Sequence, residues 1–305
     1  MTKPLALLAA GLLLLAACGA PKPPATVSDL ALAAASGDAG AIEGLIGHLG
    51  SEVSPDERGR AYKALLDAGR AASKAVMAAT GDADPARREH ALALAANLKL
   101  DGAYEAAVKA LLDPSFERAH VAAWALGELG NPAGIEPLAD AMTRFGPGLT
   151  AREAARALEK FGPRAVPALL ARMGSMRREV RGYVVRILGE IRDPRGKPAI
   201  TAALADPELR VDAVWALGTL GLVGASFDST PYLSDSDHRV RVEACRTTGL
   251  LGIKSAMTKL DVMRAKDEVV VVREWAARGK SLLTGVPEKY LTKDGKWKVP
   301  DNIYH

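Results

Sequence analysis

The chain has few of the residues that carry most enzyme chemistry. Its 305 residues include two cysteines and five histidines. The motifs Cys-x-x-Cys, His-Glu-x-x-His and Gly-x-Ser-x-Gly are absent, and so is a phosphate loop ending in Gly-Lys-Ser/Thr. No alternating strand pattern occurs before residue 285, so helices should dominate. We therefore predict a non-catalytic protein with no metal site and no cofactor.

A helical phrase that returns eight times, at intervals of 29 to 32 residues, is the main feature present. AHVAAWALGELG at 119–130 and ELRVDAVWALGTLG at 208–221 are two copies. Each copy has an anchor, the position just before a Gly-like step: Leu65, Ala95, Leu126, Leu158, Leu188, Leu217, Thr248 and Lys280. A unit of this length holds two short helices but cannot bury its own apolar face. The pattern predicts an all-α fold, an α-solenoid of about eight helical hairpins.

The columns of the aligned copies define a buried face. Four positions before the anchor, seven of the eight copies place Ala, and apolar residues three before and three after complete a stripe at helical spacing. Three Asp-Pro pairs should cap first helices: Asp84-Pro85, Asp113-Pro114 and Asp206-Pro207. Second helices are expected at 135–142, 166–173 and 199–204. Segment 28–50 is interpreted as a degenerate copy that closes the array.

The copies AAWALGELGNPAGIEPL and AVWALGTLG resemble HEAT repeats of the short type found in phycobilisome-lyase-like proteins. The resemblance covers residues 28–284 and implies an interaction scaffold, with a HEAT-type lyase or metal-dependent oxidoreductase as a weaker alternative. Deoxyhypusine hydroxylase, a HEAT-repeat enzyme, binds a di-iron centre through His-Glu pairs. Here four histidines precede other residues, in the pairs His48-Leu49, His90-Ala91, His120-Val121 and His238-Arg239, and His305 is terminal. The ligand pairs of that enzyme are therefore missing.

The N-terminus has the form of a secretory signal. One Lys precedes an apolar run that is short for a membrane span. The sequence Leu-Ala-Ala-Cys resembles a bacterial lipoprotein processing site, which implies removal of residues 1–17, lipidation of Cys18 and an envelope location. Gly19 favours the outer membrane, facing the periplasm. Residues 18–27 then form the lipidated Cys and a Pro-rich tether, and Cys245 is expected to be a buried core residue.

Charge along the chain is uneven. Residues 23–57 contain six acidic side chains and no Lys or Arg, whereas residues 151–197 contain twelve basic and five acidic ones. A basic centre of this kind could bind an anionic envelope lipid or polysaccharide, and the plain alternative is a solvated Arg-rich surface. No nucleic-acid partner is expected.

Two columns contain Arg for different reasons. Seven positions before the anchor lie Arg58, Arg88, Arg181, Arg210, Arg241 and Arg273. This Arg column shares the side of the core stripe, so we expect it to bond loop carbonyls and Asp. Two positions before the anchor lies an outward row that includes Trp124, Arg156, Arg186, Trp215, Arg246 and Arg278. The outward row either binds another envelope protein or merely pairs Arg with Trp.

The repeat stops at Gly285, and residues 285–305 form a tail. Asp294-Gly295 between alternating runs predicts a short β-hairpin. We expect Tyr290 and Trp297 of this hairpin to cap the last repeat. The alternative is a tail that docks a partner.

Overall fold

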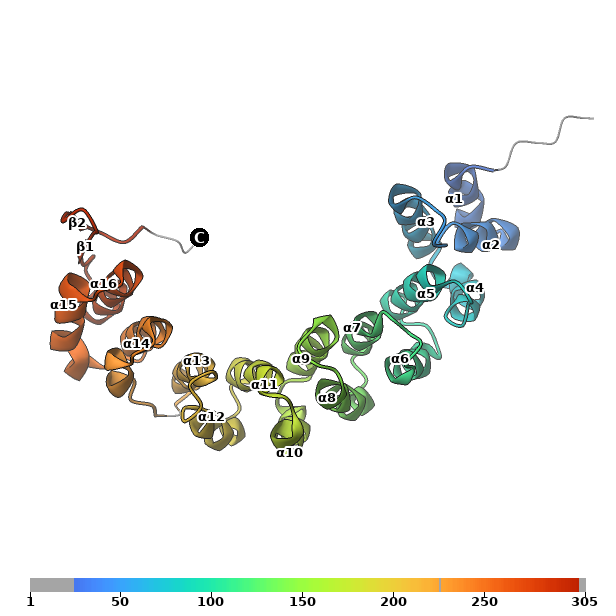
Figure 1. Ribbon diagram of the computed structural model, residues 1–305. Coiled ribbons are helices and arrows are strands. Elements are labelled where there is room, and N and C mark those ends of the chain that lie inside the picture. The colour runs from blue at the N-terminus through green and yellow to red at the C-terminus, as the bar shows by residue number, and fades with distance from the viewer. Residues whose placement is uncertain (1–24, 225, 302–305) are drawn as a thin grey trace, which may run out of the picture.

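The computed structural model describes residues 25–224 and 226–301, and these form an open arc of stacked helical hairpins (Figure 1). The first helices of the eight repeats are α3 (Pro55–Ala68), α5 (Pro85–Asn97), α7 (Ala119–Leu129), α9 (Leu149–Phe161), α11 (Arg178–Ile191), α13 (Arg210–Gly221), α14 (His238–Leu250) and α16 (Val270–Thr284). The second helices are α4 (Ser73–Ala79), α6 (Ala103–Leu112), α8 (Ile135–Arg144), α10 (Val166–Arg172), α12 (Lys197–Ala203) and α15 (Met257–Lys266). The predicted all-α solenoid is confirmed.

Both ends of the array, and one internal repeat, depart from this plan. α1 (Val27–Ala35) and α2 (Ala39–Gly47) precede the first repeat, and Thr26 caps α1 through a capping box with Asp29. The sixth repeat has the short 3₁₀ helix Thr230–Ser234 where other repeats have a second helix. The eighth ends in the antiparallel strands β1 (Tyr290–Leu291) and β2 (Trp297–Lys298), which confirms the hairpin.

The Asp-Pro pairs play two different roles. Asp84 caps α5 as expected. It also accepts hydrogen bonds from the amide and hydroxyl of Ser51, which lies in the loop between α2 and α3. Burial would raise the pKa of Asp84, but these hydrogen bonds outweigh it and lower the pKa to about 2. The same expectation was wrong for Asp113 and Asp206. Their side chains accept amides within the inter-repeat turns, and α7 and α13 begin several residues later.

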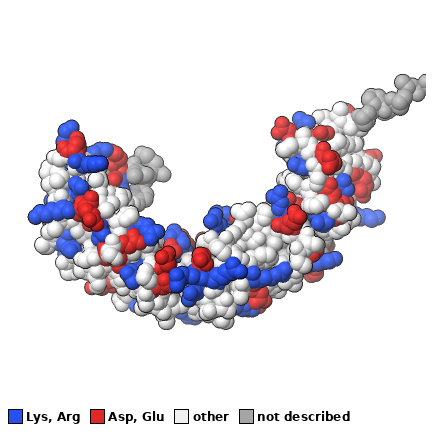
Figure 2. All heavy atoms as spheres, in the orientation of Figure 1, with Lys and Arg blue, Asp and Glu red and all other residues white. Residues whose placement is uncertain are grey.

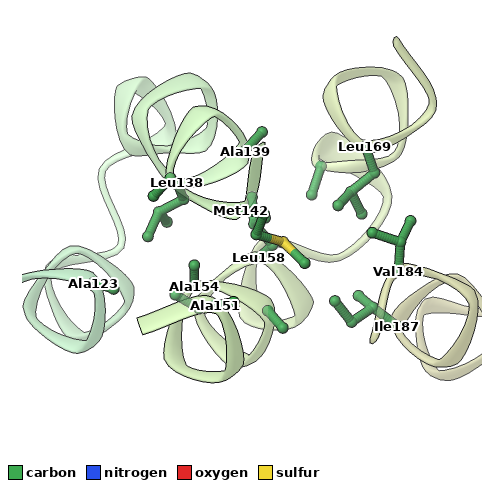
Figure 3. Packing of buried hydrophobic residues seen from close by; sticks show 14 of the residues in the cluster. Ala123, Leu138, Ala139, Met142, Ala151, Ala154, Leu158, Leu169, Val184 and Ile187 are labelled. Carbon is green, nitrogen blue, oxygen red and sulfur yellow. The ribbon is translucent and has the colours of Figure 1, made fainter. Parts of the chain in front are cut away.

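The core runs along the array between first and second helices. Every Ala four positions before an anchor is completely buried. Figure 3 shows Leu138 and Met142 of α8 facing Ala154 and Leu158 of α9, so large side chains from the second helix fill the space above small ones. Each repeat therefore depends on its neighbours for burial, as its length requires.

Neighbouring first helices touch along a seam of glycine and small residues. The Gly at one position after the anchor faces the residue one before the next anchor, in the pairs Gly127–Ala157, Gly189–Ala216, Gly218–Thr247 and Gly249–Gly279. A Cβ at Gly189 would lie 2.7 Å from the Cβ of Ala216, and one at Gly279 would lie 2.4 Å from the carbonyl oxygen of Cys245. Only Gly fits these positions without displacing backbone.

The first helices line the inner side of the arc and the second helices line the outer side (Figure 1). The Gly seam brings first helices closer than larger contact residues would allow. Neighbouring first helices contact each other more extensively than neighbouring second helices do, and the stack curves towards the first helices. The inner, concave face is thus built from the outward positions of α3 to α16.

The tail covers the last repeat. Tyr290 is buried, Lys280 pairs with Glu288, and Arg273 donates to the carbonyl oxygens of Leu291 and Thr292. Trp297, also expected to take part in the cap, is 49% exposed. Its ring lies under the guanidinium of Arg264. The first strand of the hairpin thus lies against α15 and α16.

We predict opposite effects for Ala at two helical glycines. Gly279→Ala should lower the free energy of unfolding by about 2 kcal/mol or more, because its methyl group would overlap the Cys245 carbonyl. Gly59→Ala in α3 should raise it by up to about 1 kcal/mol, since nothing lies within 4 Å and Ala favours helix. Chemical denaturation compares the two, and equal midpoints would contradict the close packing of the seam.

Candidate functional site

The concave face carries the outward row. Arg156 and Arg186 are exposed, whereas the side chains of Trp124, Trp215, Arg246 and Arg278 are partly buried. All six lie on consecutive first helices from α7 to α16. The structure therefore places the predicted residues along one face.

A row of carboxylates accompanies the arginines. Arg156 pairs with Glu153 at 2.6 Å, and Arg278 pairs with Glu274 at 2.7 Å, both within one helix. Arg186 of α11 reaches Asp212 of α13 at 2.8 Å. The sequence reasoning missed these acids, although Glu153, Asp212 and Glu243 all stand five positions before an anchor. This acidic column is visible in the sequence and could have predicted the pairing. The acidic residues and the arginines of the outward row form a line of ion pairs along the concave face, which we call the ladder.

The centre of the outward row is a packed stack. The guanidinium of Arg186 lies over the ring of Trp215, 4.6 Å from its centroid, between α11 and α13. This is the Arg–Trp pairing that remained as the alternative to partner binding. A second stack, Arg278 over Trp275 at 4.8 Å, involves a Trp outside the predicted row.

Glu243 lies in the next part of this ladder. Burial raises the pKa of the Glu243 carboxyl, against the opposing effect of the nearby guanidiniums of Arg246 and Arg186. The Glu243 Oε2 atom is 3.6 Å from Arg246 Nη1, and neither atom has a hydrogen-bond partner among the described residues. The distance between these two atoms is the longest among the ion pairs of the ladder.

Two hollows open on the concave face at the two ends of the row. The N-terminal hollow, of about 520 Å³, is lined by Tyr62, Glu89, His90, Ala93, His120, Val121, Trp124, Glu153 and Arg156. The C-terminal hollow, of about 940 Å³, is lined by Arg246, Leu250, Trp275, Arg278, Ser281, Leu282, Gly285, Val286, Pro287, Val299, Pro300 and Asp301. Four of the six predicted residues thus line hollows.

The Arg column bonds loops rather than lining the concave centre. Five of its members donate to backbone carbonyls, namely Arg58, Arg88, Arg210, Arg241 and Arg273. Arg241 is 7% exposed and also holds Asp267 through two hydrogen bonds of 2.9 Å. The remaining member, Arg181, has a buried Nε without a hydrogen-bond partner among the described residues. Arg58 and Arg88 also line a hollow of about 600 Å³ next to the N-terminal hollow.

The basic centre, residues 151–197, carries a smaller excess of unpaired positive charge than its own composition suggests. Four of its cations pair with carboxylates that lie outside 151–197: Lys160 with Glu128, Arg172 with Glu136 and Asp140, Arg178 with Asp206, and Arg186 with Asp212. Figure 2 shows Lys and Arg over the middle repeats with Asp and Glu beside them. Much of the charge excess is therefore neutralised by neighbouring repeats.

Histidines and cysteines form no cluster in the described part of the chain. No group of three or more His, Cys, Asp or Glu there could hold a metal ion. His48 pairs with Glu57, and His90 Nδ1 lies 2.7 Å from the carbonyl oxygen of Ala86. Cys245 is buried, and burial raises the pKa of its thiol.

Cys18 lies outside the described residues. Within residues 25–224 and 226–301, no helix has the length and apolar character needed to cross a bilayer.

Stacked helical hairpins with a lined concave face define an α-solenoid repeat protein. Among family models, the one described as HEAT repeats matches residues 166–228, and the PBS lyase HEAT-like repeat matches residues 119–144 and 150–174. These matches identify residues 119–144 and 150–228 as HEAT-like repeats, in part of the phycobilisome-lyase type. The comparison with curated proteins found no match.

Solved structures share the fold at low identity. The crystal structure of the Escherichia coli protein YIBA has 16% identity and a TM-score of 0.52, and the match covers 87% of this chain and 99% of that chain. Human deoxyhypusine hydroxylase in complex with glycerol has 18% identity, with coverage of 84% and 98%, and a TM-score of 0.34. The first likeness supports the fold alone, and the second supports no inference about activity.

We predict that Arg241 is required for stability, unlike its neighbour Arg239. Arg241→Ala should lower the free energy of unfolding by about 3 kcal/mol or more, because it leaves the 9% exposed Asp267 side chain without its cation. Arg239→Ala removes a guanidinium that is 64% exposed and pairs only within its own turn, so the change should stay within about 0.5 kcal/mol. Urea denaturation measures both. If Arg241→Ala kept full stability but lost a partner, the Arg column would be a binding surface.

Proposed function

We propose that the protein is a non-catalytic scaffold, lipid-anchored in the bacterial cell envelope, that binds another protein along its concave face. The observation that carries this proposal is the coincidence of the outward row with two hollows on one face. HEAT repeats typically serve as interaction modules rather than catalysts. Trp, Tyr and Arg are also the residues most enriched at interaction hot spots.

The N-terminal hollow supports partner binding most directly. Trp124, Tyr62 and His120 offer aromatic rings, and Arg156 and Glu89 offer charges of both signs. A mixed surface of this kind suits a folded protein or peptide better than a uniformly anionic molecule. The pairing of the central cations also disfavours the alternative of an anionic lipid or polysaccharide.

The envelope anchor rests on the N-terminal sequence. The apolar run and the sequence Leu-Ala-Ala-Cys resemble a lipoprotein signal, with Cys18 as the lipidated residue. Eight residues, 19–26, separate Cys18 from α1. A chain of that length reaches at most about 28 Å, so lipidation would hold the first helices of the solenoid close to the bilayer.

Replacing Cys18 tests the anchor. Cys18→Ala should move the protein from the membrane fraction to the soluble fraction and abolish incorporation of labelled palmitate, because acyl chains supply the membrane affinity. Cys245→Ala is the matched control and should keep both signals. Palmitate labelling of the Cys18→Ala protein would refute lipidation at this residue.

Paired Arg variants test the concave face. Arg156→Ala/Arg186→Ala should abolish crosslinking of the partner in living cells, at unchanged helical circular dichroism. Arg164→Ala/Arg192→Ala is the control, since it removes equal charge from two exposed arginines that have no carboxylate partner among the described residues. If both double variants retained the crosslinked protein, partner binding by the outward row would be ruled out.

A further inference from the structure

The C-terminal hollow differs in character from the rest of the concave face. Its floor comes from α14 and α16, and its wall comes from tail segments 285–287 and 299–301. The tail after β2 reaches over the concave side of α16 (Figure 1). The volume of about 940 Å³ falls within the range of about 300 to 1,000 Å³ common for ligand sites.

Apolar side chains are exposed in this hollow. Leu282 is 57% exposed, Val286 56%, Val299 40% and Leu250 37%. They come from two helices and both tail segments, so they form one patch rather than scattered exposures. Clustered exposed apolar surface of this kind marks a binding site.

Two guanidiniums border the apolar patch. The Nη1 atom of Arg246 is buried and has no hydrogen-bond partner among the described residues; the nearest oxygen of Glu243 is 3.6 Å from it. The hydrogen bonds of Arg278, to Glu274 and to the carbonyl oxygen of Asp301, use Nη2 alone. Arg278 therefore has donor groups left for an acceptor, and the buried Nη1 group of Arg246 lacks one.

The charges around the hollow limit what that acceptor is. Two carboxylates, those of Glu243 and Glu274, lie beside the two guanidiniums, and the carboxylate of Asp301 pairs with Lys298 at the edge of the hollow. A segment with several acidic residues would meet repulsion from these groups. A ligand with one carboxylate and otherwise apolar groups avoids it, and a planar carboxylate matches the fork of a guanidinium.

We propose that the C-terminal hollow binds the free C-terminal end of a polypeptide whose last side chains are apolar. The terminal carboxylate accepts hydrogen bonds from Arg246 and Arg278, and the final side chains pack on Leu250, Leu282 and Val286. A chain terminus places a single carboxylate directly beside apolar side chains, which is the combination that this hollow accommodates. This inference deepens the proposed function, because it names the part of a partner that the concave face would receive.

The test uses the full chain and a set of fluorescein-labelled hexapeptides that end in pairs of Leu, Ile, Val or Phe. Each peptide is made with a free C-terminal carboxylate and with a C-terminal amide, and fluorescence anisotropy gives the dissociation constants. Carboxylate peptides should bind, and amidation should weaken binding about tenfold or more, because it removes the charge-assisted hydrogen bonds. Equal affinity of both forms, or no carboxylate peptide binding at about 1 mM, would overturn the proposal.

Two variants separate the carboxylate contact from the apolar one. Arg246→Gln should reduce the affinity for carboxylate peptides about tenfold and leave the affinity for the amides unchanged. Leu282→Gln should weaken both forms, and its high exposure protects the fold from the change. Arg239→Gln, on the same helix but outside the hollow, is the control and should bind like the unmodified protein. Unchanged binding in both Arg246→Gln and Leu282→Gln would place the peptide elsewhere.

This outcome is independent of the partner crosslinking test. Loss of crosslinking in Arg156→Ala/Arg186→Ala with no peptide binding would support the scaffold and refute the peptide site. Peptide binding with crosslinking intact in that variant would support the site and refute partner binding through Arg156 and Arg186.

Discussion

The close contact between successive first helices determines most of this molecule. Gly189 against Ala216 and Gly249 against Gly279 bring backbones together where a methyl group would already overlap. Dispersion attraction is strongest at such short separations and needs no side-chain ordering. Neighbouring second helices, such as α8 and α10, contact each other less extensively than neighbouring first helices, such as α7 and α9. The difference bends the stack, and the bend places the first helices on the inner face.

The packing of the first helices determines which of their side chains lie on the inner face. Each first helix is flanked by two others and covered by a second helix, so only its remaining side is free. Curvature brings the free sides of neighbours together, which is how Arg186 of α11 reaches both Asp212 and Trp215 of α13. Compensation of charge follows from the same proximity. Arg186 is thus paired by the adjacent repeat, whereas Arg156 and Arg278 pair with carboxylates of their own helices.

The sequence predicted the solenoid because the decisive contacts repeat at a fixed interval. Ala four before the anchor and the apolar stripe are local signals, and all those Ala residues are buried. The pairing of charges was out of reach, since Lys160 meets Glu128 and Arg172 meets Glu136 across a repeat boundary. Counting the charges within one stretch of sequence cannot reveal ion pairs with residues outside that stretch. The prediction that Asp113 caps α7 was also wrong. The Asp113 side chain accepts a hydrogen bond from the amide of Ser115 within the turn, and α7 begins only at Ala119.

The end of the array explains why the C-terminal hollow exists. An internal first helix packs against the next first helix, but no helix follows α16 within the part of the chain that the structure describes. The tail takes the place of a following helix only in part. Glu288 forms a salt bridge with Lys280 of α16, and Tyr290 is buried. Two strands of two residues cannot also cover Leu282 and Val286, which stay exposed. A solenoid that ends this way retains one incompletely covered step, and there the guanidiniums of the outward row lie beside apolar surface.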